Sequence, residues 1–353
     1  MILPHSYVQS VALLLLSLVL LGFWPLLFRR SKGWRFELFG LDFAIGAFVT
    51  SLIVAFTFGS LGMDGFSFVD DFLNAAKSQW VIGFAAGAAF NLANMLFLGA
   101  VSVGGVSVAA TIAMGLSVLV GIGLPHLLRH RVSPVFLFAS FALILAAIVC
   151  AALAHNGEIS ERVAMLIRQA KAANRKILSL PGTAKGVILA VTAGLLYSLY
   201  FPLVGRSRIG EIALGPYSCM FLVALGIFVS APVLFIFFIN LPVEGEPLDP
   251  SAYFRGSGQA HGMGLSAGAM WIIGALIPMM LASVEGPAQV TLPIFFPLAF
   301  AAPLLTVLLG VLVLRENRTA AGRLRPAALA MLLLLAAGVG LAALAPLFVK
   351  SAA

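Results

Sequence analysis

The chain has 353 residues, of which 61% are hydrophobic and 10% are charged, and its formal net charge is +8. Soluble domains have roughly 25% charged residues, so this composition, with a mean hydropathy of +1.09, excludes an ordinary soluble protein and indicates an integral membrane protein. The excess of positive charge does not indicate nucleic-acid binding, because the basic residues are placed in alternate loops.

Apolar runs of about 20 residues are long enough to cross a bilayer as helices. The sequence contains ten such runs, so we predict an all-α integral membrane protein with ten transmembrane helices. In chain order, the predicted spans are 7–28, 37–61, 81–101, 103–127, 134–154, 187–205, 214–240, 262–283, 287–314 and 327–349.

The loops on the two sides of these spans differ in charge. One side holds 15 of the 21 Lys and Arg residues, in the loops 29–36, 156–186, 241–261 and 315–326, and the other side holds 6. Short cytoplasmic loops carry the excess of Lys and Arg. We therefore expect both termini to face outward, in a multi-pass protein of the cell membrane (plasma or inner) whose first span is not cleaved.

The longest loop, 156–186, has a basic, amphipathic pattern that is typical of a helix on the inner leaflet. Its sequence GTAKG, at 182–186, lacks the spacing and the following Ser or Thr of a phosphate-binding loop, so no nucleotide cofactor is predicted. Cys150 and Cys219 fall within predicted spans. They are expected to be packed thiols rather than a disulfide or a metal site.

An internal repeat organises the chain. GFAAGA at 83–88 aligns with GLSAGA at 264–269, and SVGG at 102–105 aligns with SVEG at 283–286, both at an offset of 181. FWPLLFRRS at 23–31 aligns with YFPLVGRSR at 200–208, at an offset of 177. These matches predict a five-helix repeat at 1–155, a cytoplasmic linker at 156–186 and a second five-helix repeat at 187–353.

Five is an odd number, so the second repeat would enter the membrane from the opposite side. Inverted repeats of this kind place a substrate site near the bilayer midplane and permit alternating access. A duplicated scaffold without transport activity is the alternative. The sequence thus favours a secondary transporter.

Two asparagines lie within the third predicted span, on the same face as the glycines of a G-x-x-x-G motif. Small residues one turn apart let helix backbones approach each other, so Gly83 and Gly87 mark a face that packs against protein. Asn91 and Asn94 continue that face. They are predicted either to hydrogen-bond a polar substrate or to bond neighbouring helices together, and the sequence leaves both interpretations open.

Several segments resemble the ureide permeases, a family of the drug/metabolite transporter superfamily. They are LLGFWPLLFRR after the first span, LDFAIGAFVTSLIVAFTFGSLG in the second, FNLANMLFLGAVSVGGVSVAATI across the third and fourth, and GVLVLRE at 310–316. The resemblance covers most of residues 10–155 and, more loosely, 187–345.

The resemblance implies a ten-helix secondary carrier that moves allantoin, uracil and related oxo-heterocycles with protons. More distant relatives move monosaccharides such as glucose or rhamnose. The chain departs from the plant pattern at Ala109, where the resemblance would place an acidic residue, and in its short central loop. A monosaccharide carrier and a membrane scaffold that does not transport therefore remain the alternatives, and an enzyme is not expected.

A small neutral polar solute needs hydrogen-bond donors and acceptors together with rings to stack upon. The sequence offers these in and near the predicted spans. The predicted substrate-binding residues are Asn91, Asn94, Trp271, Thr111, Gln289, Thr291, Trp24, Tyr197 and Tyr200. Trp and Tyr near span ends are also common interfacial anchors, which is the alternative for Trp24 and Tyr200.

Acidic residues near the bilayer are few, and a carboxylate is the usual proton carrier of a symporter. Asp42 and Glu285 are the candidates for proton coupling. Asp42 is predicted either to be buried or to pair with a basic residue at the interface. The sequence predicts no metal site and no nucleic-acid partner. The expected partners are the lipid bilayer, the solute and protons, and the sequence leaves the oligomeric state open.

Overall fold

The computed structural model describes residues 1–353 except for 32, 173–182, 211, 319–321 and 350–353. The described residues form helices and connecting loops, with ten helices long and apolar enough to cross a membrane. The predicted all-α class and the ten spans are confirmed. The first half contains α1 (Tyr7–Arg30), α2 (Phe36–Phe56), α3 (Phe68–Asn74), α4 (Lys77–Gly104), α5 (Val106–Ser117), α6 (Leu124–Leu128) and α7 (Pro134–Ala172).

The second half contains five long helices and two short 3₁₀ turns among its described residues. The helices are α8 (Thr183–Ser207), α9 (Pro216–Asn240), α10 (Gly258–Leu281), α11 (Leu292–Leu312) and α12 (Pro326–Leu344). A 3₁₀ turn, η2 (Pro250–Arg255), precedes α10, and another, η3 (Gly286–Ala288), precedes α11.

The helix boundaries follow local chemistry. Ser6 caps α1 in a capping box with Gln9, which satisfies backbone donors that have no partner within the helix. Proline, whose missing N–H costs nothing at a first helical position, begins α7, α9 and α12. Pro25 and Pro202, aligned by the internal repeat, lie inside α1 and α8.

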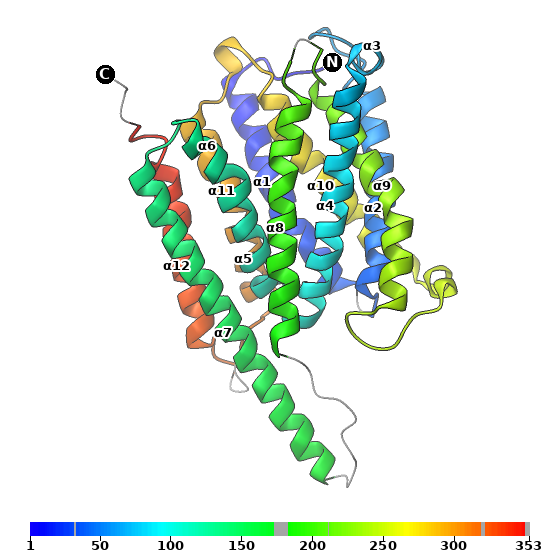
Figure 1. The fold of residues 1–353 in the computed structure, drawn as a ribbon, viewed down its shortest axis with the longest axis vertical. Coiled ribbons are helices and arrows are strands. Elements are labelled where there is room, and N and C mark those ends of the chain that lie inside the picture. Colours follow the sequence, from blue (N-terminus) through cyan, green and yellow to red (C-terminus); the bar gives the residue numbers. More distant parts are fainter. Residues whose placement is uncertain (32, 173–182, 211, 319–321, 350–353) are drawn as a thin grey trace.

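Two predicted elements differ from the structure. The fourth span is one continuous helical segment, Val106–Leu128, but it contains a π-helical turn, η1 (Val118–Gly123), between α5 and α6. The fifth span does not end near 154: α7 continues as one helix to Ala172 and projects beyond the bundle (Figure 1). Gly157 alone does not interrupt it, since one glycine inside a helix costs only about 1 kcal/mol. The first part of the predicted linker is therefore an extension of α7, and residues 173–182 lie outside the described residues.

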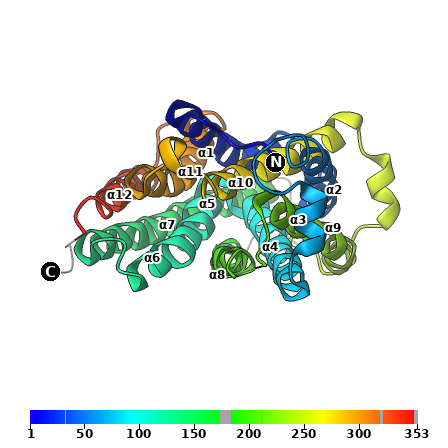
Figure 2. The ribbon, with the colours of Figure 1, turned by 90° about the horizontal axis from the view of Figure 1, so that it is seen from above.

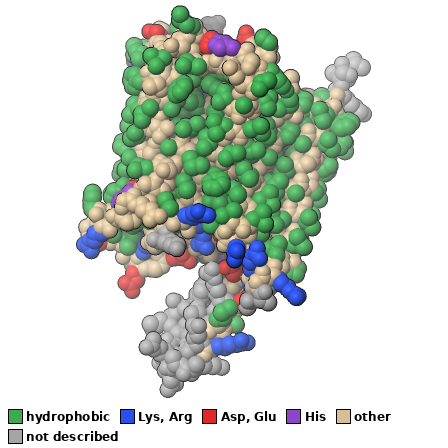
Figure 3. Space-filling model, turned by 180° about the vertical axis from the view of Figure 1, so that it is seen from behind, with side chains coloured by type: hydrophobic (Ala, Val, Ile, Leu, Met, Phe, Trp, Pro, Cys, Tyr) green, Lys and Arg blue, Asp and Glu red, His purple; other side chains and the backbone are tan. Residues whose placement is uncertain are grey.

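Hydrophobic side chains cover the flank of the bundle, and Lys and Arg gather toward one end of it (Figure 3). Nonpolar side chains that face outward over the height of the helices are what a lipid environment requires. The structure and composition together describe a multi-pass membrane protein. The end with more basic residues is that of the predicted cytoplasmic loops, and both described chain ends lie toward the other (Figure 1).

The main contacts between helices occur in equivalent pairs. Each such contact that a helix of one half makes is matched by a contact of the equivalent helix in the other half. Helix α2 packs on α10 and α4 on α9, while α1 packs on α10 and α11, and α8 packs on α4 and α5. Seen from above, α1 and α8 lie on opposite sides of the molecule (Figure 2). These are the contacts that two equivalent five-helix halves would make. The inverted relation between the halves stays a prediction.

Four glycines lie where the backbones of these paired helices approach most closely. A Cβ added at any of them would come within 2.1 Å of a carbonyl oxygen on the facing helix. The four are Gly87 and Gly226 between α4 and α9, and Gly46 and Gly268 between α2 and α10. Gly87 belongs to the G-x-x-x-G motif of the third predicted span, which therefore faces protein as the sequence predicted. Gly268 is its counterpart in the repeat, within a second G-x-x-x-G motif formed with Gly264.

Candidate substrate cavity

A cavity of about 560 Å³ lies between α1, α5, η1, α6, α8, α10 and α11. Its volume is within the range of sites for small molecules. The residues that line it extend from the middle of these helices to the end of the bundle where the termini lie, as His126, Ile209 and Phe295 show. The cavity is therefore reached from the side that the basic residues predict to be outside.

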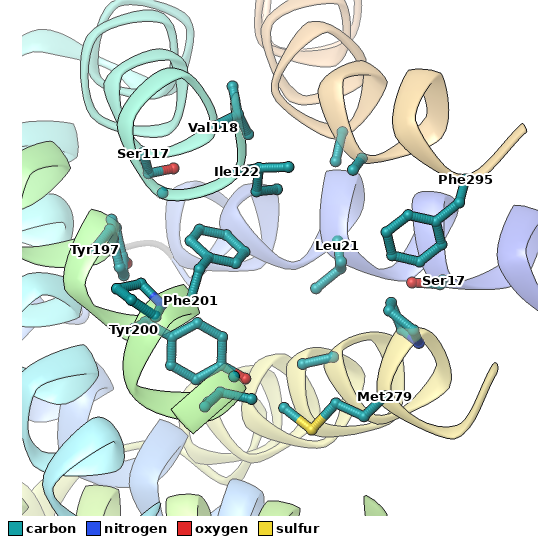
Figure 4. A pocket seen from close by; sticks show the side chains of 18 of the residues that line it. Ser17, Leu21, Ser117, Val118, Ile122, Tyr197, Tyr200, Phe201, Met279 and Phe295 are labelled. Carbon is teal, nitrogen blue, oxygen red and sulfur yellow. The ribbon is translucent and has the colours of Figure 1, made fainter. Parts of the chain in front are cut away.

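Aromatic rings form the deep end of this cavity. Phe90 of α4 and Trp271 of α10 have ring centroids 3.9 Å apart, and Tyr197 and Tyr200 of α8 contact Phe90 at 5.1 and 5.5 Å. Trp271 also lies edge-on to Tyr200 at 5.8 Å. We call Phe90, Tyr197, Tyr200 and Trp271 the aromatic floor. Figure 4 shows both tyrosines beside Phe201 at the edge of the cavity.

The internal repeat explains why the floor forms at this level. Trp271 is the residue that the offset of 181 aligns with Phe90, and the offset of 177 aligns Trp24 with Phe201. All four line the cavity. Residues at equivalent positions of the two halves lie next to each other where the halves are in contact. Aromatic rings from distant parts of the chain therefore come together in the cavity.

Hydrogen-bonding atoms are sparse around the floor. The Tyr197 hydroxyl donates to Asn94 Oδ1 at 3.1 Å, which fixes the direction of the ring. The Tyr200 hydroxyl and Asn94 Nδ2 are buried and have no hydrogen-bond partner among the described residues. An unpartnered buried polar group costs about 1–3 kcal/mol. The Tyr200 hydroxyl, whose residue lines the cavity, is therefore a candidate for contact with a polar ligand.

Four of the predicted substrate-binding residues line the cavity: Trp24, Tyr197, Tyr200 and Trp271. Trp24 and Tyr200 are 2% and 7% exposed, which does not suit interfacial anchors in contact with headgroups. Trp24 packs against Phe43 and Phe97, with ring centroids 5.2 and 5.7 Å away. Trp24 thus lines the cavity on one side and packs against the protein core on the other.

The two asparagines are in different environments. Asn91 donates to Ile227 O at 3.1 Å and to Ser230 Oγ at 2.9 Å, both on α9, so it bonds α4 to α9. Asn94 lies behind Tyr197 and reaches the cavity only through that ring. The structure therefore places Asn94, and not Asn91, next to the candidate site.

The remaining predicted polar contacts lie outside the cavity in this conformation. Thr111 is buried and donates to Ser107 O at 2.8 Å within its own helix. Gln289 and Thr291 are exposed where the chain enters α11. Their roles stay predictions, since none of the three lines the cavity as it stands here.

The outer part of the cavity is basic, a feature that the sequence-based inventory missed. Arg129, Arg206, Arg208 and His126 line it. Arg208 donates from one terminal nitrogen to Ser283 Oγ at 2.6 Å, and its Nε is buried without a partner among the described residues. Burial lowers the pKa of Arg208, while Cys219, Asp71 and Tyr200 nearby raise it. Arg208 lies between the predicted spans 187–205 and 214–240, so nothing in the sequence indicated that it belongs to a substrate cavity.

The opposite end of the bundle is closed by a carboxylate at a helix N-terminus. Glu316 accepts hydrogen bonds from Val106 N at 2.9 Å and from both Ser107 N and Ser107 Oγ at 2.8 Å. Arg29 approaches it to 3.5 Å. A carboxylate is stabilised at a helix N-terminus by the unpaired N–H groups there. This network joins α1, α5 and the end of α11 beneath the floor.

Of the two proton-coupling candidates, Asp42 is buried and Glu285 is exposed. Asp42 accepts hydrogen bonds from Trp34 Nε1 at 2.9 Å and from Tyr253 Oη at 2.5 Å, and it lies 2.8 Å from His261 Nδ1. Burial raises the pKa of Tyr253, and the Asp42 carboxylate raises it further. Among the described residues, the basic partner of Asp42 is thus His261, while the nearby Arg35 pairs with Glu37 at 2.6 Å.

Known proteins resemble this chain in sequence and fold. The sequence model of the ureide permease family matches residues 39–180. Ureide permease 5 of Arabidopsis thaliana is 23% identical over 94% of this chain and 93% of its own length. Ureide permease 2 of the same plant is 25% identical over 70% of this chain and 76% of its own length.

The fold also occurs in a solved structure described only as the crystal structure of a protein. It has a TM-score of 0.53 and 16% identity, and the match covers 96% of this chain and 97% of the other. The predicted resemblance to the ureide permeases is confirmed. The chain is therefore a membrane transporter rather than an enzyme.

Proposed function

The chain is a relative of the ureide permeases, and we propose that it carries small amide-containing heterocycles, such as allantoin and uracil, across the plasma or inner membrane by alternating access. The observation that carries this proposal is the aromatic floor at the closed end of the cavity. Planar rings of the solute can stack on Trp271 and Phe90. The Tyr200 hydroxyl, which has no partner among the described residues, supplies a polar contact beside the stack, and Asn94 orients the Tyr197 ring next to it.

Alternating access is supported by the unequal packing of the two ends. The cavity is open toward the termini, while the Glu316 network joins α1, α5 and α11 at the other end. For the solute to cross, this network has to open and the outer wall has to close over the floor. The paired helix contacts support such a rocking movement, because each half makes the contacts that the other half makes.

Proton coupling, where it occurs, is proposed to use Asp42. This carboxylate is 1% exposed and its titratable neighbours are His261 and Tyr253. Gly264 of α10 lies against it, so close that an added Cβ would come within 2.4 Å of Asp42 Cβ. Trp271 lies two turns further along α10. A change in the hydrogen bonds of Asp42 would therefore act on the helix that carries part of the floor.

Uptake of labelled solutes into proteoliposomes tests the proposal. We expect uptake of allantoin and uracil to exceed uptake of glucose, and we expect Trp271→Ala to lower their affinity roughly threefold to tenfold, the loss of about 0.5–1.5 kcal/mol of aromatic contact. Trp80→Ala is the matched control, because Trp80 stacks on Phe72 away from the cavity and should leave the affinity unchanged.

The same measurement with and without an imposed pH gradient tests the coupling. Asp42→Asn should remove the part of uptake that the gradient drives and leave exchange of internal for external solute in place. Preferential uptake of glucose would replace the proposed substrate class by monosaccharides, and the absence of any uptake would favour a scaffold.

A further inference from the structure

The outer wall of the cavity carries positive charge that a neutral solute does not need. Arg129, Arg206 and Arg208 line it together with His126, and no acidic side chain does so among the residues that the structure describes. Glu211 lies outside those residues. Asp71 accepts a hydrogen bond from Gly215 N at 2.9 Å and is not part of the cavity wall.

Arg208 is the member of this group that is placed to bind a ligand. It follows the last residue of α8, on the helix face that carries Tyr197, Tyr200 and Val204, all of which line the cavity. Its guanidinium bonds to Ser283 Oγ, two residues beyond the end of α10, at 2.6 Å, which holds it in the outer wall of the cavity. Arg208 and Tyr200 line the same cavity.

The hydrogen bonds of Arg208 are incomplete. A guanidinium has five N–H donors, and the described bond to Ser283 Oγ uses one terminal nitrogen. Among the residues that the structure describes, neither its buried Nε nor the buried Tyr200 hydroxyl has a hydrogen-bond partner. Two unpartnered donors above a stacking surface match a flat group with two acceptor oxygens, because guanidinium and carboxylate form paired hydrogen bonds.

We propose that the cavity selects solutes with a carboxylate or a similarly delocalised negative charge, held by Arg208 and Tyr200, with the amide portion on the aromatic floor. The inference rests on the proposed function and deepens it, since it names an anionic ureide as the preferred substrate class. Arg129 and Arg206, exposed at the mouth, attract such an anion by long-range electrostatics, and this contribution weakens as salt concentration rises.

Hydantoin and hydantoate test the proposal because they share the ureide group. Hydantoin is a neutral ring at pH 7, and hydantoate is its ring-opened carboxylate. Binding of each is measured by calorimetry on the purified full-length chain in detergent. We expect hydantoate to bind more tightly than hydantoin, and we expect Arg208→Gln to weaken hydantoate roughly tenfold to a hundredfold, as the loss of a charged hydrogen bond would.

Two further variants separate recognition from structure. Arg131→Gln is the matched control, since Arg131 is an exposed arginine at the same end and does not line the cavity; it should leave the preference unchanged. Arg208→Lys keeps the charge and should retain part of the preference. If Arg208 only clamped Ser283, Arg208→Gln would lower the melting temperature and leave the ratio of the two affinities as it was, which would overturn the inference.

If the variants do not fold, comparing the affinities of hydantoin and hydantoate for the unmodified chain still tests the proposal. Tighter binding of hydantoin than of hydantoate would refute the anionic preference and leave the proposed function standing. Binding of neither ureide would defeat the proposed function itself, and the inference with it.

Discussion

Trp271 and Asn91 show how much the role of one residue depends on its partners. Both were predicted to bind substrate, and both are buried. Trp271 contacts Phe90 and lines the cavity, so its ring can contact a solute there. Asn91 uses its amide nitrogen on Ile227 O and Ser230 Oγ of α9. Its oxygen is buried without a partner among the described residues, in a position away from the cavity.

We therefore predict that Asn91→Ala reduces stability and leaves solute affinity unchanged. Hydrogen bonds between transmembrane helices contribute about 0.6 kcal/mol on average and up to about 1.7 kcal/mol, so a small fall in melting temperature is expected. Asn94→Ala should behave differently, because Asn94 orients Tyr197 and its loss should weaken binding. Measuring melting temperature and affinity on both purified variants checks this, and an affinity loss confined to Asn91→Ala would reverse the assignment.

Glycine determines the separation of the helices at the element scale. Gly226 of α9 would, with a Cβ, come 2.1 Å from Phe84 O of α4. Gly87 makes the reciprocal contact from α4 to Val223 O, at 2.0 Å. Backbone atoms cannot move away as a flexible side chain can, so the two helices would have to separate. Small residues at such crossings are typical of membrane helix packing.

Gly226→Ala is accordingly predicted to destabilise the protein by about 1–3 kcal/mol, the usual cost of overpacking. Gly340→Ala in α12 should have the opposite sign, because nothing lies within 4 Å of the added Cβ and alanine is the better helix former by about 1 kcal/mol. Thermal unfolding of the two purified variants is the measurement. Equal effects from both would mean that the close approach of α4 and α9 is not required for stability.

The π-helical turn η1 is a second feature that arises between elements. Gly121, within it, would meet Phe201 Cδ2 at 2.3 Å if it carried a Cβ, and Val118, Gly121 and Ile122 line the cavity. Single π-turns inside α-helices are frequent at functional sites. Here the turn brings the α5–α6 wall against α8, and so shapes the cavity opposite the aromatic floor.

At the scale of the whole molecule, the cavity opens at one end of the bundle and the Glu316 network closes the other. The distribution of basic residues assigns the open end to the outside. The long helix α7 extends from the closed end, where Glu161 pairs with Arg325 at the start of α12 at 2.6 Å. The extension is therefore attached to the second half of the bundle, next to the predicted cytoplasmic loops.

Labelling of intact cells tests this orientation. A cysteine in place of Gln289, exposed at the open end, should react with a membrane-impermeant maleimide. A cysteine in place of Glu246, exposed at the closed end, should react only after the membrane is permeabilised. The unmodified chain, whose cysteines are Cys150 and Cys219, gives the background. The reverse pattern would mean that the cavity opens toward the cytoplasm.

The sequence by itself determined the properties that depend on short stretches of chain. The length of an apolar run decides whether it spans a bilayer, so the ten spans were predicted with ends that mostly differ from the structure by a few residues. Glycine spacing identified the packed faces of α4 and α10. The residue-by-residue alignment of the repeat placed Trp271 opposite Phe90, the pair that forms part of the floor.

Only the tertiary structure decided which polar groups meet. Asn91 and Asn94 are three residues apart on one face, yet one bonds to α9, 136 residues away at Ile227, and the other to Tyr197, 103 residues away. The position of Arg208 in the cavity wall depends on its hydrogen bond to Ser283, which follows the end of α10. Periodicity identifies the face of a helix but not the neighbour that covers it, because that neighbour is chosen by packing between segments far apart in the chain.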